Sequence, residues 1–277
     1  MPEVDTRPLD TARRLAESGD LDAAAVIFAE LAADPDDPDR AQAAVGLAVV
    51  LGERGDVAGS RAAARTALAT GHPEFAAQAA CLLAGSFERE GLADQARAAW
   101  QAALGVGHPA YVPPAHMALA RLATDAREAE RSLRDALATA DPEIASHAAQ
   151  RLAEGYLEDG EPGEAARVLL EALSVPEVTE VARLRVMLGI AHLDLACAEF
   201  SAAVEEGGDG GDGDGGDGGD GGYGGDTETG ALAIELLART LPLRGRDEDA
   251  ERVWRYGLDS ADADLAGEVR LRLDRDL

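Results

Sequence analysis

The side chains best suited to catalysis or metal binding are few in this sequence, and they are scattered. His72 and His108 each precede a proline, in segments expected to be turns between helices. His116, His147 and His192 have no carboxylate or cysteine companion at the spacing that a metal site requires. The chain has no phosphate-binding loop, dinucleotide glycine fingerprint, HExxH helix or paired-cysteine zinc spacing. We therefore expect no catalytic residues, no cofactor and no metal site.

A tract of glycine and aspartate over residues 207–226 contains 13 Gly, 6 Asp and one Tyr. Its carboxylates raise the alternative of calcium binding, but an EF-hand loop beginning at Asp212 would need a glycine at Asp217 and a glutamate at Tyr223. A segment of this composition buries no apolar surface and does not hold a helix. We therefore expect a disordered, solvated insertion, with calcium binding as the less favoured alternative.

The two cysteines, Cys81 and Cys197, lie far apart in the sequence and are most simply small buried apolar residues, with a redox role as the less favoured alternative. The first ten residues carry acids and no apolar core, unlike a signal peptide. No segment approaches about 18 consecutive apolar residues without a charge or a glycine, so no transmembrane helix is expected. These features predict a soluble cytoplasmic protein with reduced thiols.

The 277-residue chain carries 53 acidic side chains against 25 basic ones, and its formal charge is −28. A field of this sign disfavours duplex nucleic acid and anionic membranes as partners. Hydrophobic residues make up 46% of the chain but aromatic residues only 4%, and alanine supplies much of the apolar share. Such small side chains suit a core of closely packed helices.

Glycines recur at a fixed interval and mark an internal repeat. Gly19, Gly55 and Gly91 are spaced 36 residues apart, each between two segments whose apolar residues recur at helical spacing. Gly160 and Gly245 occupy the same place in two later segments. Two short amphipathic helices joined by a tight turn cannot bury their apolar faces alone, so such units are stable only when stacked. Prolines are expected to begin several first helices, at Pro73, Pro109, Pro142 and Pro176.

This unit resembles the tetratricopeptide repeat, whose pattern has a small residue on the first helix, Gly-Asp at the turn, and alanine with a bulky side chain on the second helix. Here the small residues on the first helix are Ala12, Ala48, Ala84, Ala153 and Ala238. The second-helix alanines include Ala24, Ala96, Ala165 and Ala250, and the bulky residues are Phe28, Trp100, Leu169 and Trp254. The resemblance, to a bacterial (actinobacterial-like) type with ~36-residue repeats, implies an all-α solenoid that forms a right-handed superhelix.

The resemblance extends over about seven helix-turn-helix units. The units at 109–140 and 176–206 lack the turn glycine, and we expect their second helices to follow shortened turns. We predict a single solenoid over 6–275, interrupted by the disordered Gly/Asp-rich insertion at 207–226 and closed by a C-terminal capping helix at 261–275.

The resemblance also implies where a ligand would bind, because members of this family bind extended peptides or helices of other proteins along a concave groove lined by first helices. Carried over by register, the candidate groove residues are Gln42, Gln78, Glu88, Arg121, His147, Gln150, Glu154, Glu235 and Arg239, interleaved with the apolar Val45, Val49, Met117, Leu184 and Leu188. The lysine and asparagine set that grips a terminal carboxylate in chaperone-binding members is absent. An acidic peptide terminus is therefore not the expected ligand, and the ordinary alternative for each residue is a solvated helix face.

Two functions are compatible with these features. The first is a non-catalytic protein–protein interaction scaffold that binds a peptide or helix in the groove, with basic partners favoured by the acidic surface. The second is a regulatory or sensory array that self-associates, or that works with a separately encoded effector such as a transcription factor or an ATPase. An enzyme is disfavoured, because nothing in the sequence assembles a nucleophile, a base and an oxyanion site. The oligomeric state and the partner stay open.

Overall fold

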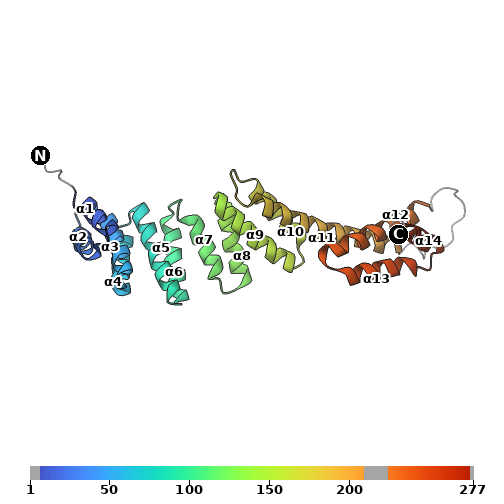
Figure 1. The fold of residues 1–277 in the computed structure, drawn as a ribbon, viewed down its shortest axis with the longest axis horizontal. Helices are drawn as coiled ribbons and strands as arrows, with labels where there is room; N and C mark the ends of the chain where they lie inside the picture. Colours follow the sequence, from blue (N-terminus) through green and yellow to red (C-terminus); the bar gives the residue numbers. More distant parts are fainter. Residues whose placement is uncertain (1–6, 209–223, 275–277) are drawn as a thin grey trace. The chain divides into compact units, whose positions relative to one another are not determined.

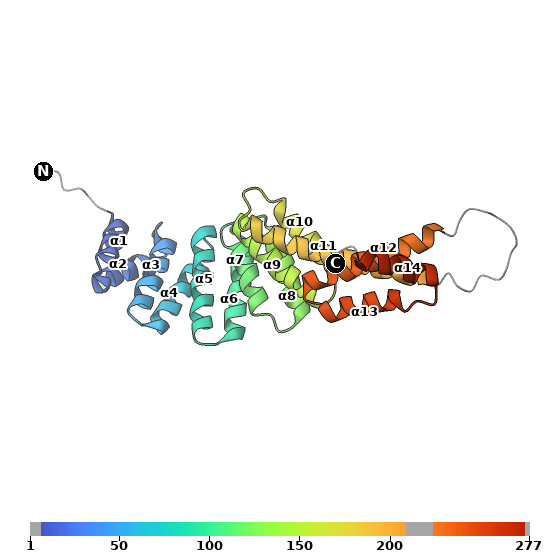
Figure 2. The same ribbon diagram turned by 45° about the vertical axis from the view of Figure 1, so that its right-hand side comes forward.

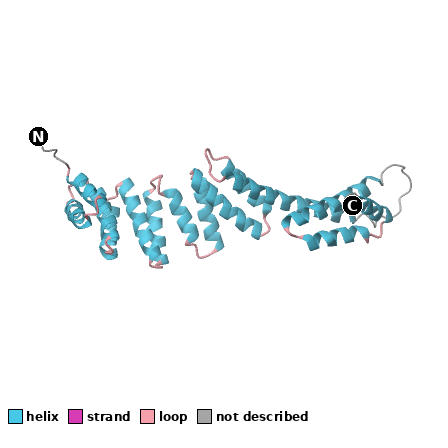
Figure 3. Ribbon diagram, in the orientation of Figure 1, coloured by secondary structure: helices cyan, strands magenta, loops and turns pink. Residues whose placement is uncertain are grey.

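The protein is all-α. The computed structural model describes residues 7–208 and 224–274, and the regular structure within these ranges is helical, without a strand (Figures 1 and 3). The helices are α1 (Pro8–Glu17), α2 (Leu21–Ala33), α3 (Arg40–Glu53), α4 (Val57–Ala69), α5 (Pro73–Arg89), α6 (Ala93–Val106), α7 (Val112–Arg121), α8 (Ala126–Ala138), α9 (Pro142–Glu158), α10 (Pro162–Leu173), α11 (Val181–Gly208), α12 (Gly224–Thr240), the 3₁₀ helix η1 (Leu241–Arg244), α13 (Asp247–Leu258) and α14 (Ala263–Leu273).

The residues group into two compact units. The N-terminal unit comprises Met1–Leu152 and Ala172–Thr179, and the C-terminal unit comprises Ala153–Glu171 and Glu180–Leu277. The predicted single solenoid over 6–275 and its right-handed superhelix depend on how these units are arranged, and both stay predictions.

Each Gly-Asp turn expected from the sequence closes one helix and starts the next. Gly19 and Gly55 have the left-handed backbone that favours glycine, with φ of 86° and 79°, and so does Gly91 at 71°, although Leu92 and not an aspartate follows it. The carboxylates of Asp20 and Asp56 accept hydrogen bonds from the backbone N–H three residues further on, at 3.2 and 2.8 Å. The glycine thus ends the first helix and the aspartate caps the second, which explains why this dipeptide recurs.

Small side chains occupy the contacts between helices, as predicted. Ala12, Ala48 and Ala84 are at most 1% exposed in the N-terminal unit, and Ala153 and Ala238 are 0% and 2% exposed in the C-terminal unit. With only a methyl group at the contact, neighbouring helices can approach closely. Figures 1 and 2 both show α1 to α8 lying side by side in chain order, so the alanine-rich composition follows from stacked helix pairs.

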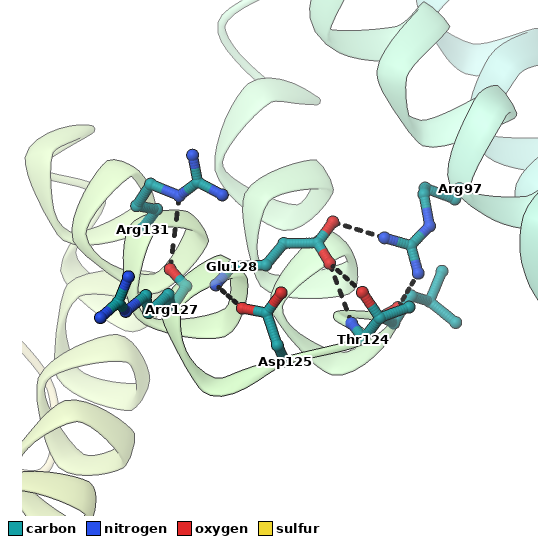
Figure 4. Close-up of polar contacts among 7 residues, drawn as sticks. Arg97, Thr124, Asp125, Arg127, Glu128 and Arg131 are labelled. Atoms are coloured by element: carbon teal, nitrogen blue, oxygen red, sulfur yellow. Dashed lines mark hydrogen bonds and ion pairs between the residues drawn. The ribbon is translucent and has the colours of Figure 1, made fainter.

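Two arginines one repeat apart attach one helix pair to the next. Arg61 in α4 donates from Nη2 to the backbone oxygen of Ser86 at 2.9 Å, and Arg97 in α6 donates in the same way to the backbone oxygen of Leu122. In each case the acceptor lies 25 residues further along the chain. Arg97 also forms an ion pair with Glu128 (Figure 4).

Glu128 stabilises the start of α8. Its Oε2 accepts hydrogen bonds from the backbone N–H and the hydroxyl of Thr124, at 2.9 and 3.0 Å, while Asp125 accepts the Glu128 N–H at 2.8 Å (Figure 4). This arrangement is a variant of the capping box. The hydrogen bonds from Thr124 and then from Arg97 lower the pKa of Glu128 from 4.5 to about 2. A turn without glycine is therefore held by a capped helix and an arginine.

The 109–140 unit forms a helix pair, as predicted, from α7 and α8. Its first helix begins at Val112, because Pro109 lies in the preceding turn. Pro73 and Pro142, by contrast, are the first residues of α5 and α9, as predicted. Pro176 also precedes its helix, α11, which begins at Val181.

The prediction of a helix-turn-helix unit at 176–206 is wrong, because a single continuous helix, α11, covers Val181–Gly208. Between Ile190 and Val204 the sequence has no glycine or proline that would end a helix. The helix therefore continues through the expected turn. The described residues contain six pairs of helices joined by short turns, this long helix, and the terminal helix α14.

By length and composition, Val181–Glu206 of α11 could cross a membrane, and its most apolar window has a mean hydropathy of 1.4. This differs from the expectation of no such segment, which treats every charge or glycine as a break. The buried core helix of a soluble protein meets the same criterion, but only 17% of this window is buried. Helix α11 packs along α12.

In the C-terminal unit, α11, α13 and α14 all pack against α12. Cys197 of α11, Leu237 of α12 and Ala250 of α13 share one small apolar cluster, and Ile234 of α12 and Val269 of α14 share another. The terminal helix α14 lies within the predicted capping helix at 261–275.

The predicted insertion at 207–226 overlaps the helices on either side. Residues 207–208 end α11 and residues 224–226 begin α12, so the expectation of disorder is wrong at these positions. Residues 209–223 lie outside the described residues.

Candidate peptide-binding groove

The N-terminal unit carries a groove of about 300 Å³ formed mainly by its first helices, α1, α3 and α5. Part of its lining is apolar and buried: Phe28, Val45 and Val50 are at most 5% exposed. Polar side chains also line it. The full lining is Arg13, Ala16, Glu17, Phe28, Gln42, Val45, Gly46, Val49, Val50, Phe75 and Gln78.

A glycine makes room for the ring that lines the groove. Phe28 of α2 is 3% exposed and packs against Gly46 of α3. A Cβ atom at position 46 would lie 2.6 Å from Cε1 and 2.7 Å from Cζ of that ring. Glycine inside a helix costs about 0.5–1 kcal/mol relative to alanine. Glycine is needed here despite this cost, because any larger residue at position 46 would displace the Phe28 ring.

Gln42 and Gln78, two of the predicted groove residues, line this groove together. They occupy the same place in consecutive first helices, 36 residues apart in the sequence, and both are partly buried. Packed helices lie about 8–10 Å apart and an extended strand rises about 3.3 Å per residue, so the two amides match backbone groups about three residues apart in an extended peptide. Each amide offers both a donor and an acceptor.

Glu88 and Arg121 are also brought together, but as partners of each other. Arg121 Nη2 lies 2.5 Å from Glu88 Oε2, and the Trp100 indole N–H donates to Glu88 Oε1 at 2.6 Å. Both carboxylate oxygens are therefore occupied. These residues connect α5, α6 and α7, and they do not line the groove.

Glu235 and Arg239 belong to a network that attaches α14 to α12. The Arg272 side chain is 8% exposed, and its Nη1 lies 3.0 Å from Glu235 Oε2. Arg239 Nε lies 3.1 Å from the other oxygen of Glu235, and Arg239 Nη2 donates to the backbone oxygen of Arg272 at 3.3 Å. The two candidates thus contact the terminal helix.

The last three candidates lie on α9. His147 and Glu154 are exposed, and Glu154 Oε1 lies 3.9 Å from Arg183 Nη2 in the C-terminal unit. Gln150 is 6% exposed and donates to the Ser146 hydroxyl at 3.1 Å. The prediction that Gln150 faces a ligand is therefore wrong, because its amide is used inside the protein.

The sequence interpretation missed the two phenylalanines of the groove. Phe28 belongs to a second helix, which the repeat register assigns to the core, and Phe75 begins a first helix. Gly46, in the middle of a helix, is the only signal that a ring approaches at that point. Of the apolar residues expected between the polar candidates, Val45 and Leu184 are buried, Met117 and Leu188 are partly buried, and Val49 is exposed.

Neither cysteine is activated for chemistry. Burial raises the pKa of Cys81 to about 11, and burial is also the largest cause that raises the pKa of Cys197. Both thiols therefore stay protonated near neutral pH. Cys197 is buried, as predicted, whereas Cys81 is only partly buried. Within 7–208 and 224–274, no group of three or more His, Cys, Asp or Glu side chains is arranged to hold a metal ion.

No protein-family model and no curated protein matches this sequence. Among solved structures, a tetratricopeptide repeat protein from Parabacteroides merdae ATCC 43184 is similar, with a TM-score of 0.45 at 14% identity over 96% of this chain and 97% of that chain. BtubC (BKLC) from P. vanneervenii is similar with a TM-score of 0.40 at 15% identity, over 98% of this chain and 89% of that chain. The chain is an all-α repeat protein of successively packed helices, and its structure is similar to that of a tetratricopeptide repeat protein.

Proposed function

We propose that this protein is a non-catalytic scaffold for protein–protein interactions, and that the groove on α1, α3 and α5 binds an extended peptide segment of a partner. The observation that carries this proposal is that Gln42 and Gln78 line one groove together with the apolar side chains of Phe28, Val45 and Phe75.

The chemistry of this lining suits a peptide backbone. A backbone N–H or C=O that is buried without a partner costs about 1–3 kcal/mol, and the glutamine amides can pair with both kinds of group. Every second side chain of an extended segment points the same way, so alternate residues would enter the apolar part of the groove. The apolar contacts would provide affinity, and the amides would fix the register.

The charge of the protein favours a basic segment. The formal charge is −28, and in the groove Arg13 lies 3.7 Å from Asp10 whereas Glu17 is exposed. Long-range attraction would then raise the association rate, and salt would lower it. We expect the interaction to take place in the cytoplasm, where thiols stay reduced.

The test begins with selection of peptides from a displayed random library on the full chain. The Kd of each selected peptide is then measured by fluorescence anisotropy for two variants. Val49→Arg places a long cation in the groove, and Val57→Arg places the same side chain on α4 outside it; both valines are 38% exposed. We expect Val49→Arg to weaken binding about tenfold or more and Val57→Arg to leave it unchanged. A library that yields no binder, or equal binding by the two variants, would contradict the proposal.

A further inference from the structure

The terminal helix α14 is attached to the rest of the C-terminal unit by few buried side chains. It packs against α12 and α13 (Figures 1 and 2). Of its 11 residues only Val269 and Arg272 are buried, and Val269, at 0% exposed, is the one apolar side chain of the two. An element with so few buried apolar contacts opens at a lower free energy than the core of its unit. We therefore expect α14 to detach while α12 and α13 stay folded.

A glycine of α13 forms the seat of Val269. Gly257 is buried, and a Cβ atom at this position would lie 3.0 Å from both γ carbons of Val269 and 3.0 Å from Cδ1 of Ile234 on α12. The missing side chain leaves a notch between α12 and α13, and Val269 fills it. Ala231, Ile234 and Val269 form one apolar cluster, and Leu265 of α14 packs against it. A single branched side chain thus closes the notch.

The second buried side chain of α14 is charged and incompletely paired. Arg272 Nη1 lies 3.0 Å from Glu235 Oε2, and Arg272 Nη2 lies 3.9 Å from Glu228 Oε1, both on α12. The Nε atom of Arg272 is buried and has no hydrogen-bond partner among residues 7–208 and 224–274. A buried N–H of a charged group without a partner opposes docking. The attachment of α14 therefore includes an unfavourable contribution that an ordinary apolar contact lacks.

Detachment of α14 would uncover the notch beside two carboxylates. Glu235 would keep Arg239, whose Nε lies 3.1 Å from Glu235 Oε1, but it would lose Arg272. Glu228, whose side chain is 75% exposed, would lose its contact with Arg272 as well. Arg239 balances one of the two carboxylates, so the uncovered surface has a place for one more cation. It fits a helix with a branched apolar residue and, three residues later, an arginine, the arrangement of Val269 and Arg272.

We propose that α14 is an autoinhibitory helix, which occupies in cis a binding site for a helix of a partner protein. The partner helix displaces α14, places a branched apolar side chain in the notch at Gly257, and places a cation against Glu228 and Glu235. Helix α14 itself is the template for this chemistry, because its own contacts define the site. The site is separate from the groove on α1, α3 and α5.

A second copy of the chain is a less suitable occupant than a partner's helix. Its α14 would make the same contacts that α14 already makes in cis, and the short segment 259–262 holds the cis helix at an effective concentration of about millimolar. Exchange between two copies therefore gains no contact and loses the tether. A partner's helix can bury more apolar surface than Leu265 and Leu273, which are only partly buried.

The first measurement is hydrogen exchange of the full wild-type chain, which requires no variant. We expect the amides of α14 to exchange at least about tenfold faster than those of α12 and α13. Equal protection of the three helices would overturn the proposal, because α14 would then open only together with the rest of its unit.

The second measurement is the binding of a fluorescent synthetic peptide with the sequence of residues 261–274 to variants of the full chain. Val269→Ser loosens α14 in the chain, and Leu271→Ser, at a position 61% exposed on the same helix, is its matched control. Gly257→Ala places a methyl group in the notch. A second peptide with the Val269→Ser exchange controls for nonspecific binding.

We expect Val269→Ser to bind the peptide about tenfold or more tightly than the wild-type chain does, because the site is free in a larger fraction of the molecules. Leu271→Ser should bind as the wild-type chain does. Addition of Gly257→Ala to Val269→Ser should weaken binding about tenfold, and the control peptide should bind to none of the chains.

Absence of peptide binding by Val269→Ser, or equal binding by Val269→Ser and Leu271→Ser, would overturn the proposal. Loss of amide protection in α12 and α13 of Val269→Ser would also overturn it, because α14 would then be part of their fold. A dimer of the wild-type chain in light scattering that Val269→Ser abolishes would make a second copy the occupant and would exclude the partner's helix.

Discussion

Replacing Gly46 with alanine should destabilise the N-terminal unit, although the same exchange normally stabilises a helix. The helix propensity of alanine favours the variant by about 0.5–1 kcal/mol. The new methyl carbon, however, would lie 2.6, 2.7 and 3.0 Å from three atoms of the Phe28 ring, which is 3% exposed. Overpacking of this kind costs about 1–3 kcal/mol, so the net loss should be between about 0 and 2.5 kcal/mol, with a midpoint of about 1 kcal/mol.

The same helix offers a matched control. At Gly52 the nearest atom to a new Cβ is the Ser60 hydroxyl oxygen at 3.4 Å, an ordinary contact. Gly52→Ala should therefore stabilise the unit by about 0.5–1 kcal/mol. The two alanine variants of α3 are predicted to differ in the sign of their effect.

Thermal unfolding followed by calorimetry measures both effects, because 1 kcal/mol shifts Tm by about 2–4 °C in a unit of this size. Hydrogen exchange of the α2 and α3 amides assigns the change to the N-terminal unit. If Gly46→Ala raised the melting temperature as Gly52→Ala does, the close packing of Phe28 against α3 would be refuted.

Three further predictions follow from particular contacts. Because the folded state lowers the pKa of Glu128 from 4.5 to about 2, its contribution to stability is present above pH 4.5 and is lost as the pH falls toward 2; Glu128→Gln should flatten the dependence of the urea midpoint on pH in this range, and unchanged pH profiles would argue against the capping contact. His192 is exposed inside the continuous helix α11, and His192→Pro should lower the free energy of chemical unfolding by about 3 kcal/mol or more. A small effect would favour the predicted turn over a continuous helix. Ala84→Leu, at a position that is 0% exposed, should cost about 1–3 kcal/mol, and a neutral result would show that the repeat register is wrong.

The regular part of the fold could be predicted because local rules and packing agree there. Gly19 and Asp20 together specify the turn. Gly19 adopts the left-handed backbone that ends one helix, and the Asp20 carboxylate caps the start of the next. The spacing of 36 residues then places Gln42 and Gln78 on equivalent faces of two helices, and they line one groove. Equivalent positions in successive repeats have equivalent surroundings, so the placement of these two residues could be predicted without knowledge of tertiary contacts.

The remaining features depend on contacts that the register does not encode. The apolar spacing of Phe200, Ala203 and Val204 fits a second helix, but it fits the continuation of the first helix equally well, and only a glycine or proline would have separated the two. Gln150 has the sequence position of a groove residue, yet Ser146 one turn earlier accepts its hydrogen bond. Whether a polar side chain faces a ligand or a neighbour was therefore not predictable from its position alone.

The most direct test of the proposed scaffold function is an NMR titration of the glutamine side-chain amides with a peptide selected on the full chain. Gln42 and Gln78 lie in the groove, whereas Gln101 is exposed on α6 outside it and serves as an internal control. The proposal predicts that the amide signals of Gln42 and Gln78 shift together on binding and that the signal of Gln101 stays in place. A shift at Gln101 with no change at Gln42 and Gln78 would contradict it.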